Sequence, residues 1–209
     1  MDKEIKDFLN YGVETAVITR KGIIEQDALI LFFSLINMLL SGFSIPMCVI
    51  NILVFLGCSI LTFSRQSVTG EKYFFIVGIW SVSFGIVLGI AGTLLVLLTI
   101  EKQYHFRFGI IIFVIYLLVI TLFAGMILRL IKRGAYSQVK KTTGGVGFTL
   151  FGAAGISVAR LLSKGMGNEV AIQCGGICFY LVSFLMVSFG FLGLVKYYFL
   201  KKLREAEVD

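Results

Sequence analysis

The sequence predicts an all-α integral membrane protein: a six-transmembrane-helix bundle with an N-terminal amphipathic helix and both termini cytoplasmic. Three observations predict it. Of the 209 residues, 58% are apolar and only 15% are charged, and the charges avoid five long stretches of chain. These charge-free runs are 28–64, 73–100, 108–128, 142–159 and 170–195. A transmembrane helix needs about 20 apolar residues, so every run except the fourth is comfortably long enough to span.

Residues 1–26 are predicted to be a cytoplasmic segment that holds an amphipathic helix over 2–19. Ile5, Phe8 and Val13 fall on one side of this helix, and charged residues fall on the other. Acidic side chains outnumber basic ones in its first fourteen residues, so anionic lipid would not attract it. We therefore expect it to dock on the protein's own cytoplasmic loops or on a partner.

The membrane domain, 27–199, opens with an uninterrupted run of 37 residues from Ala28 to Ser64. As one helix this run would be about 55 Å long at 1.5 Å per residue, against roughly 30 Å of hydrocarbon. Pro46 lies near its middle, and proline removes a backbone donor and disfavours helix in the residue before it. The sequence thus predicts a hairpin with spans at 27–45 and 47–63; a single kinked, strongly tilted helix is the alternative.

Four further spans complete the predicted bundle. The third covers 73–100, the fourth 109–131 and the sixth 170–195. The fifth, 142–162, is rich in glycine and alanine and only marginally hydrophobic, so it is either a protein-buried span or a re-entrant segment. Residues 200–209 form a short cytoplasmic tail of mixed charge.

The basic residues predict the orientation. With six spans, 15 of the 19 basic residues fall on one side of the membrane and 4 on the other. The positive-inside rule then places both termini in the cytoplasm, with the protein in a plasma membrane. If 142–162 did not cross, the bases of the C-terminal tail would lie outside, so the charge balance favours a crossing. The composition, rich in Lys, Ile and Phe, is typical of a bacterial membrane protein.

Small residues recur in the third and fifth spans at spacings that bring helix backbones close together. In the third span they are Gly78, Ser81, Gly85, Gly89 and Gly92, and in the fifth they include Gly152 and Gly155. We interpret them as helix-packing or partner-binding positions. The two spans pack against each other, or they form a seam with another transmembrane protein or with a second copy of the chain.

Asn37, Asn51 and Gln173 are the polar intramembrane candidates. Interhelical bonds from such carboxamides contribute roughly 0.5–2 kcal/mol. Counted from Pro46, Asn37 and Asn51 differ in depth by about 6 Å, so they need not pair directly, and they serve either as structural contacts or as the lining of a polar cavity. The sequence places no carboxylate inside any span, which weighs against an ion-coupled transporter without excluding a facilitator.

The remaining candidates for chemistry favour structural roles. His105 is the single histidine and lies among aromatic and basic residues of an outer loop, while Cys174 and Cys178 share a helix face without a CxxC motif. No catalytic motif, metal-ligand set or phosphate-binding loop is present. We expect neither an enzyme nor a cofactor or metal site. The net charge of +7 belongs to span ends, so we expect no nucleic-acid partner.

These observations predict a non-enzymatic membrane protein that binds another membrane component, either as an accessory subunit or as an immunity-type protein against a membrane-active toxin. The alternative is a small channel or facilitator subunit without ion coupling, lined by Asn37, Asn51, Gln173 and the fifth span. A polar cavity reaching from one face to the midplane favours the channel. A dry bundle favours the interaction protein.

Overall fold

The computed structural model describes residues 5, 8–9, 18–42, 44–63, 67–68, 71–135 and 168–206. Within these ranges, five helices are long and apolar enough to cross a membrane, so the chain is an all-α, multi-pass membrane protein. They are α2 (Arg20–Leu40), α3 (Ile45–Phe63), α4 (Glu71–Leu97), α5 (His105–Lys132) and α7 (Asn168–Ala206). The predicted fifth span, 142–162, with Gly152 and Gly155, lies outside the described residues.

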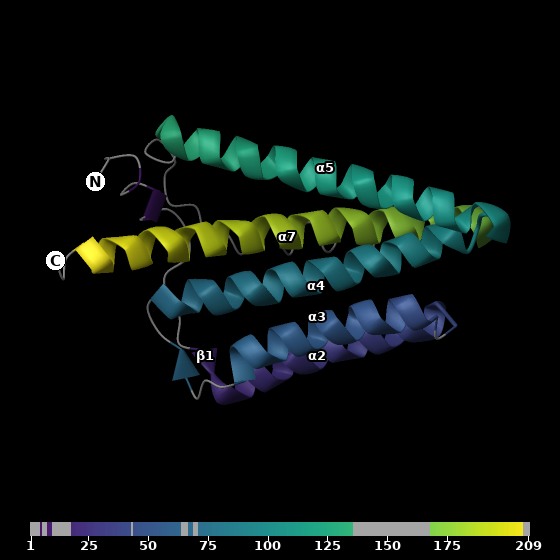
Figure 1. Cartoon of the computed structure of the whole chain (residues 1–209), viewed down its shortest axis with the longest axis horizontal. Helices are drawn as coiled ribbons and strands as arrows, with labels where there is room; N and C mark the ends of the chain where they lie inside the picture. The colour runs from purple at the N-terminus through teal and green to yellow at the C-terminus, as the bar shows by residue number, and fades with distance from the viewer. Residues whose placement is uncertain are drawn as a thin grey trace.

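The helices lie side by side, and α4 and α7 form the middle of the bundle. Figure 1 shows α5 along one edge, the α2–α3 pair along the opposite edge, and α7 and α4 between them. Within its apolar window, 56% of α4 is buried, against 6% of α5. The central helix α4 therefore joins two differently built halves, one with α2 and α3 and the other with α7 and α5.

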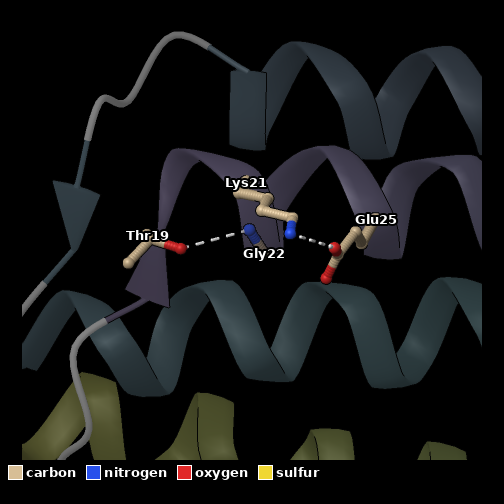
Figure 2. A network of polar contacts seen from close by, with 4 residues as sticks. All are labelled: Thr19, Lys21, Gly22 and Glu25. Carbon is tan, nitrogen blue, oxygen red and sulfur yellow. Dashed lines mark hydrogen bonds and ion pairs between the residues drawn. The ribbon is translucent and has the colours of Figure 1, made fainter.

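Helix α2 begins at Arg20, seven residues before the predicted start of the first span. Thr19 caps it: its Oγ1 accepts a hydrogen bond from the Gly22 amide at 3.3 Å. One turn on, Lys21 and Glu25 form an exposed ion pair of 3.8 Å (Figure 2). These polar turns extend the helix beyond the charge-free run, so the expected boundary at residue 27 falls inside α2.

A short antiparallel strand pair lies at the start of α2. Strand β1 (Ile18–Thr19) pairs with β2 (Ser67–Val68) from the α3–α4 connection, Ile18 opposite Val68 and Thr19 opposite Ser67. The predicted N-terminal helix over 2–19 thus does not include its last two residues. An extended Thr19 is also what an N-cap requires, because the cap residue has non-helical dihedral angles.

The predicted hairpin between the first two spans is confirmed, and the single kinked helix is wrong. Helix α2 ends at Leu40 and α3 begins at Ile45. Gly42 makes the turn in the left-handed region with φ +60°, where a side chain would be strained. Pro46 lies in the first turn of α3, where its missing amide costs no helical hydrogen bond.

The later spans differ from expectation mainly at their ends. Helix α4 stops at Leu97, before the predicted residue 100, and the 3₁₀ turn η1 (Lys102–Tyr104) leads into α5. Helix α7 continues through the predicted cytoplasmic tail to Ala206. Hydropathy locates the apolar part of a helix, but the helix itself continues into water as long as its residues favour it.

Phe8, one of the few described residues of the N-terminal segment, packs against the protein itself. Phe8 is fully buried in a cluster with Ile127 and Ile131 of α5, against partly buried apolar residues of α7. Its ring meets Phe199 edge-on at 6.4 Å, and Lys196 Nζ lies 5.6 Å from its centre. The expected docking surface was a cytoplasmic loop or a partner, whereas Phe8 packs against the ends of two membrane helices.

Candidate functional site

Helices α4 and α7 meet along a line of small residues, which we call the α4–α7 seam. On α4 these are Gly78, Gly85 and Gly92, and on α7 they are Gly176, Ser183 and Gly190. Both sets repeat every seven residues, the period that keeps one helix face turned toward an adjacent helix. The seam is antiparallel, because Gly92 lies beside Gly176 and Gly78 beside Gly190.

The seam leaves no room for side chains. A Cβ on Gly85 would lie 2.9 Å from the Ser183 carbonyl oxygen, and one on Gly92 would lie 2.9 Å from that of Gly176. A Cβ on Gly190 would approach the Gly78 carbonyl oxygen to 2.7 Å. These neighbours are backbone atoms and cannot rotate away, so only glycine fits at these positions.

The structure therefore places α7 where the sequence suggested either the fifth span or a partner. Gly89 also faces this side, since its Cβ would lie 3.0 Å from Ser183 Oγ. Ser81 lies elsewhere, in a groove that also involves α2. The seven-residue spacing of Gly176, Ser183 and Gly190 was visible in the sequence and would have identified α7 as the packing partner of α4.

Hydroxyl groups add polar contacts beside the seam. Ser183 Oγ donates to the Gly85 carbonyl at 2.6 Å and bonds to the Tyr116 hydroxyl of α5 at 2.5 Å. Thr93 and Tyr180 share a further hydrogen bond. Gln173, the predicted polar residue of the last span, is exposed and donates to Thr99 Oγ1 at 3.0 Å.

Asn37 and Asn51 are directly hydrogen-bonded to each other, and the bonds of Asn37 connect α2 with α3 and α4. Asn37 Nδ2 donates to Asn51 Oδ1 at 3.1 Å and to the Val87 carbonyl of α4 at 2.9 Å. Asn51 Nδ2 donates to the Met47 carbonyl at 2.8 Å. Both asparagines are 0% exposed, so no space large enough for water touches them.

A buried carboxylate, Asp27, forms a second polar cluster in the same half of the bundle. It is the eighth residue of α2 and only 5% exposed. Its Oδ1 accepts from Trp80 Nε1 at 3.0 Å and from Cys58 Sγ at 3.9 Å, and its Oδ2 lies 2.9 Å from Thr62 Oγ1. The prediction that no carboxylate lies within a span is wrong.

Sequence reasoning missed Asp27 because it took the first charge-free residue as the limit of the helix. The buried face of α2 follows a regular helical spacing of four, three, four and three: Ile23, Asp27, Ile30, Ser34 and Asn37. A search for that face with polar residues included would have put Asp27 in the core. The polar members of this face point into the contact with α3 and α4.

The other chemical candidates hold structural positions. His105 bonds through Nε2 to the Ile100 carbonyl at 2.8 Å in the α4–α5 turn. Cys174 and Cys178 are half-buried thiols without a disulfide. In the part of the chain that the structure describes, no group of three His, Cys, Asp or Glu residues is placed to hold a metal ion.

Two grooves of similar volume lie between the described helices. The α5–α7 groove, of about 560 Å³, is almost wholly apolar and is lined by Ile112, Ile115, Val119, Ile177, Leu181 and Phe184, with Tyr116 and Tyr180 among them. The α2–α4 groove, also about 560 Å³, includes Thr19, Gln26, Tyr73, Trp80 and Ser81. The first lies between α5 and α7, and the second begins at the capped end of α2.

No protein-family model matches this chain, and no curated protein or solved structure is similar to it. The function is therefore argued from the geometry alone.

Proposed function

We propose that the chain is a non-enzymatic membrane protein with six spans and cytoplasmic termini that binds a transmembrane helix of another protein at the α5–α7 groove. An accessory subunit or an immunity-type protein acts in this way. The observation that carries the proposal is the contrast between a tightly closed core and an open apolar groove on the outer helices.

The directions of α5 and α7 support the proposed fifth span, 142–162. Tyr116 contacts Ser183, and Phe123 contacts Phe184 with ring centres 5.1 Å apart, while Ile127 and Ile131 lie near the far end of α7. The two helices are thus parallel (Figure 1). Chain leaving the end of α5 has to return across the bundle to reach the start of α7, which supports a crossing by the predicted span 142–162.

The polar core supports an interaction protein over a solute pathway. A pathway needs polar groups that water or solute can reach. Asn37, Asn51, Ser34 and Thr62 are fully buried, and the two asparagines bond to each other and to backbone carbonyls. Such buried hydrogen bonds are typical of contacts between packed helices that water does not reach.

The groove has the properties of a helix-binding surface in lipid. Helix α5 is the least buried of the five described spans, and its groove side presents Ile112, Ile115 and Val119 opposite Ile177 and Leu181. Lipid tails are as apolar as these side chains, so association depends on shape and close packing rather than on hydrophobic transfer. A concave surface offers a partner helix more contact than a flat one.

Site-specific photo-cross-linking in native membranes tests the proposal. A photoreactive residue at Leu181, in the groove, is compared with one at Leu118, an exposed position on α5 outside it. We expect Leu181, and not Leu118, to capture a discrete partner protein identified by mass spectrometry. Capture of lipid alone, or of a segment of the same chain, contradicts the proposal.

The channel or facilitator hypothesis has two observations in its favour: the buried carboxylate of Asp27, and the α2–α4 groove that reaches its hydrogen-bond partner Trp80. Reconstitution of the purified protein into liposomes distinguishes it. Solute or ion flux that disappears in Asp27→Asn supports the facilitator, whereas impermeable proteoliposomes support the interaction protein.

A further inference from the structure

The contacts around Asp27 raise a question that the proposed function does not answer: what the carboxylate binds. Two helices contact it: α4 through Trp80, and α3 through Thr62 and Cys58. The ion pairs of the described residues join Lys21 to Glu25 and Lys201 to Glu205, so within these residues no cation neutralises Asp27. A negative charge held in a membrane helix without a counter-ion is costly.

The chemistry of the neighbours excludes a metal ion as the compensating charge. A metal cation needs several lone-pair ligands arranged around it. Trp80 offers only an indole N–H, and the sulfhydryl of Cys58 directs its hydrogen at the carboxylate. A cluster of donors around one carboxylate suits either the bare anion or its protonated form.

Thr62 allows both forms without moving a heavy atom. Its Oγ1 lies 2.9 Å from Asp27 Oδ2 and 3.0 Å from the Cys58 carbonyl one turn earlier in α3. A hydroxyl has one hydrogen and two lone pairs. With Asp27 ionised, Thr62 donates to Oδ2. With Asp27 protonated on Oδ2, that O–H donates to Thr62 Oγ1, and Thr62 turns its own hydrogen to the Cys58 carbonyl.

We propose that the cluster of Asp27, Thr62 and Trp80 is a proton-binding site, in which Asp27 takes up and releases a proton while the Thr62 hydroxyl reverses its hydrogen bond. The proton comes from water and returns to it, and no other bond changes. The α2–α4 groove gives it a route, since the groove runs from Thr19 past Gln26 to Trp80.

Few other titratable groups face the site. Cys58 is the one that α3 presents, and α4 presents Trp80, which does not titrate. The nearest charged residues on α2 and α4, Glu25 and Lys72, are exposed. A pH-dependent signal at the cluster therefore belongs to Asp27 or to Cys58, and substitutions separate the two.

Trp80 supplies the readout because it is the single tryptophan of the chain. In protein labelled with ¹⁵N-tryptophan and held in nanodiscs, one indole N–H resonance is present, and its hydrogen is donated to Asp27 Oδ1. We expect this resonance to move upfield in a single transition when the pH of the sample is lowered from roughly 9 to 4. Protonation weakens the charge-assisted bond and so shifts the signal.

Three variants assign the transition. Asp27→Asn, which reproduces the hydrogen bonds of the protonated form, abolishes it and fixes the resonance near its low-pH position. Cys58→Ala leaves the transition in place. Thr62→Ser keeps it at the same pH, whereas Thr62→Val, which removes the reversible hydroxyl, displaces it along the pH axis.

Two results overturn the proposal. One is a wild-type resonance that stays constant over the whole range while the helices remain folded by circular dichroism. The other is a transition that persists in Asp27→Asn or disappears in Cys58→Ala. These outcomes are independent of partner binding at the α5–α7 groove, so the two proposals fail separately.

Discussion

The two sides of α4 hold their neighbours by different means. Toward α2 and α3, the contacts include buried hydrogen bonds: Asn37 donates to the Val87 carbonyl of α4 and to Asn51, and Trp80 of α4 donates to Asp27. Toward α7, glycine allows backbone to approach backbone. Burial of apolar surface gives little net attraction between helices in lipid, so hydrogen bonds and close packing remain as the sources of cohesion. Toward α2 and α3 the buried polar contacts are side-chain hydrogen bonds. Toward α7 close backbone packing dominates, and hydroxyl groups such as that of Ser183 add hydrogen bonds beside it.

The hydrogen-bonded contacts and the backbone-to-backbone contacts differ in the substitutions that they tolerate. A hydrogen-bonded contact accepts any side chain that restores the bond, and its loss leaves polar groups unsatisfied. A backbone-to-backbone contact accepts no added atom, because the neighbour cannot move. The seam should therefore be the more sensitive side, and the predictions below rank the effects accordingly.

The largest effect is expected from Gly176→Leu. Its Cβ would lie 3.0 Å from the Gly92 carbonyl oxygen and 2.7 Å from Val96 Cγ2, so α4 and α7 have to separate. We expect a loss of more than about 3 kcal/mol, seen as a lower midpoint of thermal unfolding or as failure to fold. Gly175→Leu is the matched control, since nothing lies within 4 Å of its Cβ. Equal effects of the two substitutions would contradict the seam.

A smaller loss, about 1–2 kcal/mol, is expected from Asn37→Leu, which removes the bonds to Asn51 and Val87. Unfolding in a denaturing detergent measures it. The double variant with Asn51→Leu should lose less than the sum of the single variants, because neither unsatisfied carboxamide remains. Strict additivity would show that the two asparagines act independently.

Phe8→Ala is expected to affect the N-terminal segment more than the bundle. The fully buried ring packs against Phe199 and beneath Lys196, at the ends of helices whose other contacts remain. We expect faster tryptic cleavage in the N-terminal segment of the folded protein, with a smaller change in the thermal midpoint of the bundle. An unchanged cleavage rate would show that Phe8 does not hold the segment.

The smallest effect belongs to Lys21→Ala. Its ion pair with Glu25 spans 3.8 Å between largely exposed side chains, and such pairs contribute about 0.3–0.5 kcal/mol. The thermal midpoint should hardly move, and the small shift should vanish in high salt. A large decrease would mean that this turn of α2 contributes more than its exposure indicates.

The positions of the spans and the hairpin could largely be predicted from the sequence. Which helices pack against each other was harder to predict. Hydropathy and Pro46 predict the hairpin and the positions of the spans because the cost of burying charge in lipid is local to each segment. Which helix lies beside Gly85 depends on a match between two distant segments. The match was readable only by comparing their spacings, as with Ser183 of α7.

In the polar clusters, too, the residue types were readable from the sequence, but the contacts between distant segments were not. Asn37 and Asn51 were recognisable as intramembrane polar residues, but their mutual bond depends on the hairpin register. Asp27 was missed because Thr19 starts α2 two turns before the apolar run. A helix cap is a local signal, and here it decides whether a carboxylate lies in water or in the core.

Saturation substitution scored for folding in native membranes tests the contrast between the two sides of α4 most directly. We predict that Gly85, Gly92 and Gly176 accept no substitution, with even alanine impairing folding, whereas Asn37, Asn51 and Asp27 accept other hydrogen-bonding side chains and reject aliphatic ones. Tolerance of leucine at the three glycines would contradict the account.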